Sequence, residues 1–233
     1  MEQNLIDLKR EHQASISRPP DKYSLAARFF FFSMDFVAGR KNTLSKIKLL
    51  EILASIPYRE WEIFNYRRMT RYYQNLAVNE RARQIVSWSR EAQDNEYMHL
   101  LVVADKMKAD NISDAWYLIP PIPWLVVWGY VVFARLLATI SLQRATLFNA
   151  EFEDHAEHSY AQFVAEQPVL ETQFVDSAIV SEYGKFKSWA DVFRRIGLDE
   201  RDHRNWSFML GGKMEHVVHY EGMPELEAPI SVD

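Results

Sequence analysis

The 233-residue chain contains no cysteine, only seven glycines and no long run of basic residues. The lack of cysteine excludes disulfides, thiolate zinc sites and a cysteine nucleophile, and it leaves oxygen and imidazole groups as the ligands for any metal. The net charge of −5 argues against nucleic acid as the main partner. Few glycines and long stretches of polar and apolar periodicity indicate an all-helical protein, and the length suits one domain.

A targeting signal is also missing from the N-terminal segment, residues 1–22. This segment is polar and has two acidic residues before its first lysine. It therefore has neither the apolar core of a secretory signal nor the arginine-rich, acid-poor composition of a transit peptide. We expect a polar segment over residues 1–22, a helical domain over 23–211 and an irregular tail over 212–233.

Two stretches are apolar on every side of a helix. Residues 25–37 contain four consecutive phenylalanines, and residues 118–140 contain Trp124, Trp128 and one charged residue, Arg135. The second stretch approaches the length of a membrane span, but three prolines stand in its first turn and Arg135 lies well inside it. An interfacial helix, with Arg135 reaching the headgroups, fits better than a spanning helix or a buried core helix. Together the two stretches predict a monotopic membrane-binding face.

Capping residues and apolar periodicity predict four other long helices. The first runs from residue 44 past Tyr58, and the second covers 80–109 with Asn79 as its N-cap. The third begins near residue 142 and ends before Pro168, and the fourth covers 189–210.

Two of these helices each carry the pattern Glu-x-x-His, as Glu96 with His99 and as Glu200 with His203. Residues three apart share one face of a helix, so each pattern offers a carboxylate and an imidazole that point the same way. Either pattern alone is equally typical of a solvated side-chain pair. Glu51 lies within the apolar stripe of an earlier helix, where an isolated glutamate more often reaches water at the edge of the stripe.

The helix that ends before Pro168 offers several carboxylates within two turns. Glu153 shares a face with Tyr160, seven residues later, and this face suits a packed interior. Glu157 falls on the same face and remains the alternative. Asp154 and His158 are interpreted as a solvated i,i+4 pair on another side of the helix.

One glutamate from each of two helices and Glu-x-x-His from each of two others are the ligands of a di-iron carboxylate four-helix bundle. We therefore predict an all-α, ferritin-like bundle of this kind, with the two apolar helices added to it. Four carboxylates that face one core repel one another, and two divalent cations would cancel their charge. Oxygen and nitrogen ligands suit iron or manganese.

Four motifs resemble those of a known family. Residues 50–58 read Leu-Glu-Ile-Leu-Ala-Ser-Ile-Pro-Tyr, and residues 95–100 read Asn-Glu-Tyr-Met-His-Leu. Residues 152–160 read Phe-Glu-Asp-His-Ala-Glu-His-Ser-Tyr, and residues 199–203 read Asp-Glu-Arg-Asp-His. In this order, over roughly residues 28–205, they are similar to the motifs of the alternative oxidases, particularly the plastid terminal oxidase branch.

The resemblance implies a membrane-bound, non-electrogenic quinol oxidase that reduces dioxygen to water. It assigns the ligands of two iron ions to Glu51, Glu96, His99, Glu153, Glu200 and His203. Tyr160 matches the tyrosine near the irons, and Asn95 and Asp199 would orient the imidazoles. The quinol head group would lie near Lys46, Leu50, His155, Ala156 and Ser159. The implied partners are ubiquinol or plastoquinol, dioxygen, the lipid interface of a bacterial inner or thylakoid-type membrane and a second copy of the chain.

The chain departs from the family pattern at two positions near the quinol. Lys46 stands where the family usually has arginine, so a bidentate contact to quinone oxygen is lost. Ile52 replaces the threonine of Leu-Glu-Thr. These departures leave open a di-iron hydroxylase or desaturase that acts on a lipid-soluble substrate. A second alternative is a non-enzymatic, ferritin-like iron-binding protein, which Tyr160 and the apolar helices disfavour.

Overall fold

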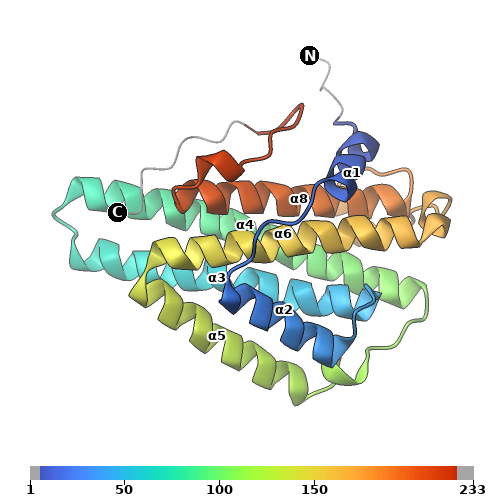
Figure 1. The fold of residues 1–233 in the computed structure, drawn as a ribbon, viewed down its shortest axis with the longest axis horizontal. Helices are drawn as coiled ribbons and strands as arrows, with labels where there is room; N and C mark the ends of the chain where they lie inside the picture. The colour runs from blue at the N-terminus through green and yellow to red at the C-terminus, as the bar shows by residue number, and fades with distance from the viewer. Residues whose placement is uncertain (1–5, 225–233) are drawn as a thin grey trace.

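The computed structural model describes residues 6–224, and this part of the chain forms helices and connecting segments without a strand. The prediction of an all-helical protein is confirmed. Four long helices form its centre, namely α3 (Leu44–Arg71), α4 (Leu76–Ala109), α6 (Leu142–Glu166) and α8 (Trp189–Leu210). Helix α3 packs along α4, α6 packs along α8, and α3 also contacts α6, so the four lie together as one bundle (Figure 1).

Side-chain caps fix where the long helices begin. Ser188 accepts a hydrogen bond from the backbone of the third residue after it, as expected for the N-cap of α8. The predicted start of α4 at residue 80 is wrong. The side chain of Asn75 caps α4 through the Val78 N–H, whereas the Asn79 amide donates to the backbone oxygen of Tyr73 at 2.8 Å. Helix α4 is therefore about one turn longer than predicted.

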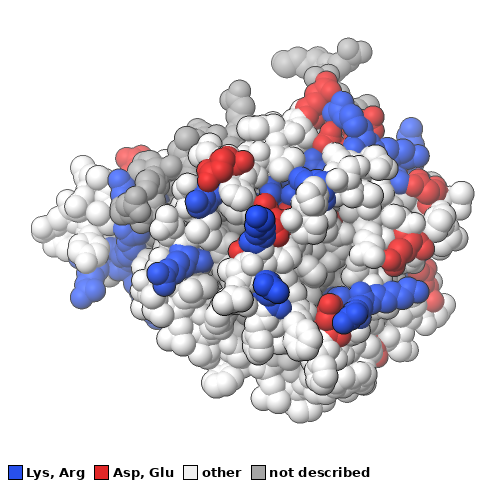
Figure 2. Space-filling view, in the orientation of Figure 1, with Lys and Arg blue, Asp and Glu red and all other residues white. Residues whose placement is uncertain are grey.

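The two apolar stretches form α2 (Leu25–Ala38) and α5 (Ile122–Ile140), which cover one side of the bundle (Figure 1). Helix α2 packs on α6, and α5 packs on α3 and α6. Their outer sides remain exposed, with Phe29 at 73 % and Trp128 at 68 %. Figure 2 shows that the lower part of this view, over α2 and α5, is largely without charged side chains.

Among the described residues, α5 is the one helix long and apolar enough to cross a membrane by length and composition, and 17 % of its most apolar stretch is buried. Arg135 does not stand alone on it. The guanidinium donates to both oxygens of Glu60 on α3, at 2.7 and 3.1 Å, while its side chain remains half exposed. Because Glu60 is buried, this bidentate pair ties α5 to the bundle.

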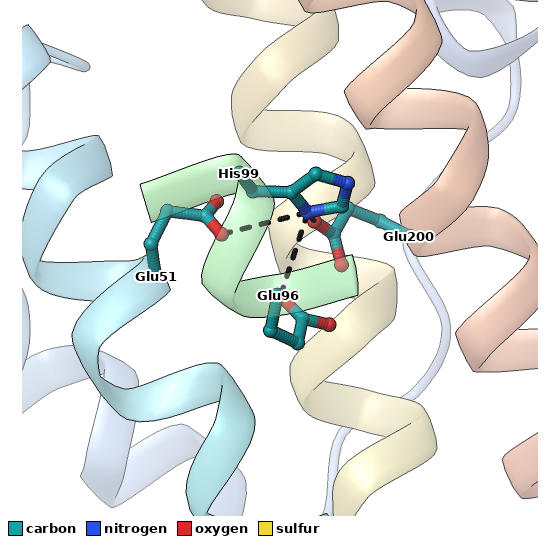
Figure 3. Close-up of side chains that lie close together, drawn as sticks. All are labelled: Glu51, Glu96, His99 and Glu200. Atoms are coloured by element: carbon teal, nitrogen blue, oxygen red, sulfur yellow. Dashed lines mark ion pairs between the residues drawn. The ribbon is translucent and has the colours of Figure 1, made fainter. Parts of the chain in front are cut away.

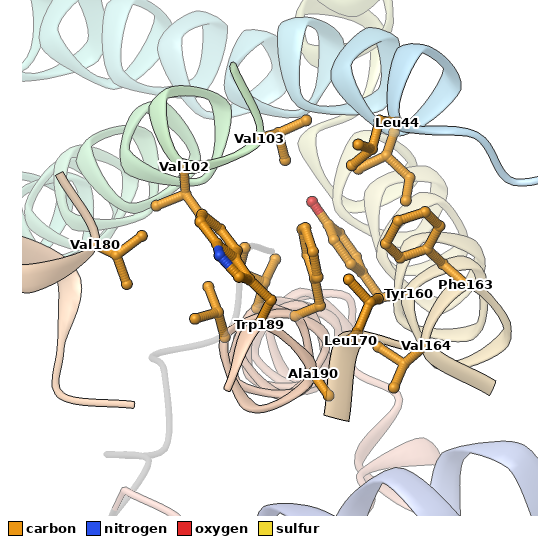
Figure 4. Packing of buried hydrophobic residues seen from close by; sticks show 14 of the residues in the cluster. Leu44, Val102, Val103, Tyr160, Phe163, Val164, Leu170, Val180, Trp189 and Ala190 are labelled. Atoms are coloured by element: carbon orange, nitrogen blue, oxygen red, sulfur yellow. The ribbon is translucent and has the colours of Figure 1, made fainter. Parts of the chain in front are cut away.

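A large apolar core lies between α4, α6 and α8 at the end that carries the start of α8 (Figure 4). Trp189 and Phe193 pack there with Val102, Val103 and Tyr160. Three short elements close the connections between the long helices. They are the 3₁₀ turns η1 (Trp116–Leu118) and η2 (Pro168–Glu171) and the helix α7 (Ala178–Tyr183).

The N-terminal segment contains a helix, α1 (Leu8–Ser17), which packs on α6 and α8. It contributes to a buried charge network, and we use this name for Glu11, Arg18, Asp154, Glu157, Arg201 and Arg204. The interpretation of Asp154 and His158 as a solvated pair is wrong. Asp154 is fully buried because the N-terminal segment and α8 cover this side of α6. The His158 Nδ1 lies 3.7 Å from Asp154 Oδ2, and the imidazole also contacts the backbone oxygens of Asp154 and Arg18.

Candidate metal centre

The four long helices bring six buried side chains together inside the bundle. They are Glu51 on α3, Glu96 and His99 on α4, Glu153 on α6, and Glu200 and His203 on α8. Each Glu-x-x-His pattern places its carboxylate and imidazole on the inner face of its helix, as the three-residue spacing predicts. The buried cluster of Glu and His side chains that the sequence predicted is therefore present.

Their ligand atoms form two overlapping groups, each lying within 4.8 Å. One contains Glu51, Glu96, His99 and Glu200, and the other contains Glu96, Glu153, Glu200 and His203. Figure 3 shows the first group, in which Glu51 and Glu200 approach His99 from opposite sides. The two groups share Glu96 and Glu200, so the arrangement offers two adjacent metal positions with two carboxylates between them.

Both imidazoles direct Nδ1 at the carboxylates. His99 Nδ1 lies 3.1 Å from Glu200 Oε1, 3.5 Å from Glu96 Oε2 and 3.6 Å from Glu51 Oε2. His203 Nδ1 lies 2.6 Å from Glu96 Oε1 and 3.6 Å from Glu200 Oε2. Several donors that converge in this way on one small space are typical of metal ligands.

Unpartnered atoms support a metal at this point. Buried polar atoms in proteins almost always have hydrogen-bond partners. In residues 6–224, sixteen buried side-chain nitrogen or oxygen atoms have none, and eight of them belong to these six residues, including both oxygens of Glu96 and of Glu200. The imidazole and carboxylate atoms approach one another without hydrogen-bond geometry. Cations between them would satisfy all eight atoms at once.

The electrostatics of the metal-free cluster also favour bound cations. Burial, together with neighbouring carboxylates, raises the pKa of Glu51 to about 8 and that of Glu153 well above its usual range. Burial also acts on Glu96, but the facing His203 lowers its pKa to about 2. Burial alone would lower the pKa of His99, yet the surrounding acidic groups raise it well above 6.5. The bare cluster therefore holds protons that divalent cations would replace, and its donors suit iron or manganese.

One imidazole is oriented from behind by a carboxylate. His99 Nε2 lies 3.2 Å from Asp199 Oδ2, as predicted for Asp199, and this contact presents Nδ1 to the cluster. Asp199 also accepts hydrogen bonds from Tyr183 and Arg195. Asn95 is half buried, and none of the hydrogen bonds found in the described range joins it to either imidazole. Sequence reasoning missed Tyr183, which lies in a weakly patterned connection.

Two tyrosines donate to the outer glutamates of the cluster. The Tyr160 hydroxyl donates to Glu51 Oε1, and the Tyr58 hydroxyl donates to Glu153 Oε1 at 2.6 Å. The Asn149 amide donates to the Tyr58 hydroxyl oxygen at 2.8 Å and to Glu153 Oε1 at 2.9 Å. Tyr58 was missed as a site residue, although it follows Glu51 by two helical turns and so lies on the same face of α3.

The predicted quinol residues lie on α3 and α6 beneath α2. Lys46 is buried, and its Nζ lies 2.6 Å from Asp35 Oδ1 on α2. The His155 ring stacks on Phe31 of α2 at 4.1 Å, and its buried Nε2 has no hydrogen-bond partner. Burial lowers the pKa of His155 to about 4, so the imidazole is neutral at pH 7. Three further residues, Leu50, Ala156 and Ser159, are also buried.

An open apolar groove of about 580 Å³ runs along α5. Ile52, next to the cluster residue Glu51, lines it on α3, and Trp124 and Trp128 line it on α5. The groove opens on the exposed apolar face of α5.

Comparison with known proteins found no similar protein or structure. A scan against protein-family models, a search of curated proteins and a search of solved structures each returned no match.

Proposed function

We propose that the protein is a membrane-associated quinol oxidase of the alternative oxidase type. In this proposal a ferritin-like bundle holds a non-haem di-iron carboxylate centre at which a quinol is oxidised and dioxygen is reduced to water. The observation that carries the proposal is the set of eight unpartnered atoms on six buried ligands. A pair of cations between the ligands would satisfy all eight.

The six side chains would hold two iron ions, with Glu96 and Glu200 shared between the two positions. Iron at this centre would supply the electron transfer to dioxygen that amino-acid side chains alone do not provide. The protein positions the ligands. Asp199 fixes the orientation of His99, while Tyr160 holds Glu51 through its hydroxyl proton.

His155 is suited to accept a hydrogen bond from a quinol hydroxyl. Its Nε2 is buried and unpartnered, and the imidazole is neutral at pH 7 because burial keeps its pKa low. Lys46 lies on the same side, where Asp35 neutralises it. Loss of two electrons and two protons converts a quinol to a quinone, and His155 would hold one quinol hydroxyl in place through its Nε2.

The exposed apolar sides of α2 and α5 support a monotopic position in a membrane. Phe32, Phe36, Trp124 and Leu136 all expose more than half of their surface on these helices. Tryptophan favours the headgroup level of a bilayer, and a lipid surface would cover aromatic and aliphatic groups that water otherwise contacts. Quinols dissolve in lipid, so the same face would receive the substrate.

Quinol-dependent oxygen uptake tests this proposal. Iron-loaded protein in lipid vesicles is expected to consume oxygen with a short-chain ubiquinol, to release no hydrogen peroxide and to resist cyanide. Glu200→Ala removes a shared ligand and should abolish the uptake. Glu151→Ala is the matched control and should retain activity, because Glu151 lies on α6 but its hydrogen bonds within residues 6–224 go to Ser24 and not to the cluster. Oxygen uptake by Glu200→Ala equal to that of the parent would contradict the proposal.

The apolar groove favours one second candidate. Its wall includes Ile52, which follows Glu51 in the sequence, and its apolar lining is suited to an acyl chain or another lipid-soluble substrate. In that case the same centre would hydroxylate or desaturate the bound chain. Oxygen uptake that needs such a substrate and yields an oxygenated or desaturated product would favour this candidate over the quinol oxidase.

A further inference from the structure

An aromatic chain leads from the candidate metal centre to the surface, and the proposed reaction does not use it. We use this name for Tyr58 and Trp61 on α3, Trp88 on α4 and Trp206 on α8. Two of its members touch ligands directly. The Tyr58 hydroxyl donates to Glu153 at 2.6 Å, and the Trp88 ring meets the His203 ring edge-on with centroids 6.1 Å apart.

The rings of the chain contact one another without a gap. Tyr58 lies edge-on to Trp88 at 4.9 Å, and Trp88 stacks on Trp206 at 3.6 Å with the ring planes only 5° apart. Trp61 packs beside both, at 5.3 Å from Tyr58 and 6.2 Å from Trp88. Trp88 is half buried, so the chain extends from the ligands to solvent.

Core packing alone explains why these rings are buried. It does not explain why they are indoles and a phenol, or why they form a continuous series from the ligands to the surface. Apolar packing does not require indoles, and an aliphatic or phenyl side chain would fill a core equally well. Indole and phenol are the side chains that most readily lose one electron in a protein without cysteine. In the aromatic chain, these indole and phenol rings contact one another from the ligands outward. They lie on the side of the centre where Tyr58 donates to Glu153, and Tyr160, which donates to Glu51, is not part of the aromatic chain.

We propose that the aromatic chain is a one-electron relay between the metal centre and the surface. The inference rests on the proposed metal centre but not on the identity of its substrate. When dioxygen has oxidised the centre and no quinol is bound, Trp88 or Trp206 gives one electron to the centre, and its indole N–H proton goes to solvent. A one-electron donor in solution, such as ascorbate, then reduces the neutral tryptophanyl radical and restores the indole with a proton from water.

The relay predicts where the protein becomes oxidised when no reductant is present. A radical that is not reduced adds dioxygen, and the peroxyl radical so formed takes one electron from iron(II) and one proton from water, which leaves an oxygenated tryptophan. Oxidants in solution attack the most accessible indoles first, and these are Trp128, Trp124 and Trp116, which are 68 %, 67 % and 61 % exposed. The relay instead selects Trp88 and Trp206, although Trp206 is only 8 % exposed. Exposure and relay therefore make opposite predictions.

The experiment loads the full-length protein with iron(II), exposes it to oxygen without quinol and maps oxygenated tryptophans by peptide mass spectrometry. Oxidation at Trp88 and Trp206 is expected to exceed that at Trp116, to vanish in zinc-loaded protein and to be suppressed by ascorbate. A transient tryptophanyl radical should appear by electron paramagnetic resonance and narrow when the indoles are deuterated. Trp88→Phe should remove the oxidation at Trp206, whereas Trp116→Phe leaves it unchanged.

Oxidation that follows exposure, or that is equal in zinc-loaded protein, would overturn the relay. The wild-type pattern decides this even where Trp88→Phe does not fold. The outcome is separate from that of the proposed function. Selective oxidation of Trp206 without quinol-dependent oxygen uptake would support the relay and refute the proposed quinol oxidation. Quinol oxidation without selective oxidation of Trp88 and Trp206 would refute the relay alone.

Discussion

Replacing Asp154 by asparagine tests whether the buried charge network holds the N-terminal segment on the bundle. The carboxylate accepts hydrogen bonds from Arg204 at 2.8 Å, Arg18 at 2.8 Å, Tyr23 at 2.9 Å and the backbone of Asp21 at 3.0 Å. Two of these four donors, Arg18 and Asp21, lie in the N-terminal segment, and Tyr23 directly follows it. Burial opposes the charge on Asp154, but the two arginines lower its pKa, so the carboxylate is ionised at neutral pH.

The magnitude follows from what asparagine leaves behind. Removing one partner from a buried ion pair costs about 3–5 kcal/mol, because the other charge stays buried. Arg204 keeps a contact to Asp21, and Arg18 keeps one to Glu157, so we expect the lower end of this range. In a protein of this size about 3 kcal/mol corresponds to a fall in melting temperature of roughly 6–12 °C.

Thermal melting followed by circular dichroism measures the effect. Glu151→Gln is the control, because Glu151 lies on the same helix and its carboxylate, in the described part of the chain, accepts hydrogen bonds from Ser24 but has no ion pair with an arginine. It should cost about 1 kcal/mol or less. The iron content of Asp154→Asn should equal that of the parent. If Asp154→Asn melts no lower than Glu151→Gln, the network does not hold the segment and the reasoning fails.

Three further predictions concern charge, helix attachment and the first tyrosine. Metal-free protein should lose stability as pH rises from about 6.5 to 8. The reason is that the pKa values of Glu51, His99 and His203 are raised in the folded state, which therefore binds more protons than the unfolded state. Metal-loaded protein should not lose stability over this range, and melting temperatures measured at several pH values compare the two forms. Arg135→Met should lower the melting temperature more than Glu60→Gln does. Arg135→Met leaves the buried Glu60 carboxylate without its partner, whereas Glu60→Gln leaves an arginine that is half exposed and can contact water. Equal shifts in melting temperature would contradict this prediction. Tyr160→Phe should keep its iron but lose quinol oxidation by at least about 100-fold in an oxygen electrode, and unchanged turnover would remove its role.

The sequence predicted what depends on local spacing. Glu96 with His99 and Glu200 with His203 share a helical face whatever surrounds them, and the structure brings both pairs together with Glu51 and Glu153. The periodicity of α6 left Glu153 and Glu157 as alternatives. The structure separates them, because Glu157 pairs with arginines of the buried charge network and Glu153 lies in the cluster.

The sequence could not predict contacts between distant segments. Asp154 has the local appearance of a surface residue, yet its partner Arg18 lies 136 residues away, and no periodicity connects the two. Tyr183 reaches Asp199 from a connection without a clear pattern. The Arg135 side chain was expected to reach lipid headgroups, but a glutamate 75 residues earlier binds it. In each case tertiary packing decides where a polar side chain points.

Metal stoichiometry tests the central claim most directly. Protein loaded with iron(II) without oxygen, then washed free of unbound metal, is predicted to retain about two irons per chain, as expected for a di-iron carboxylate bundle. Glu200→Ala should retain fewer, because Glu200 belongs to both metal positions. A chain that retains no iron or manganese, or a Glu200→Ala variant that retains as much metal as the parent, would contradict the metal centre and everything proposed from it.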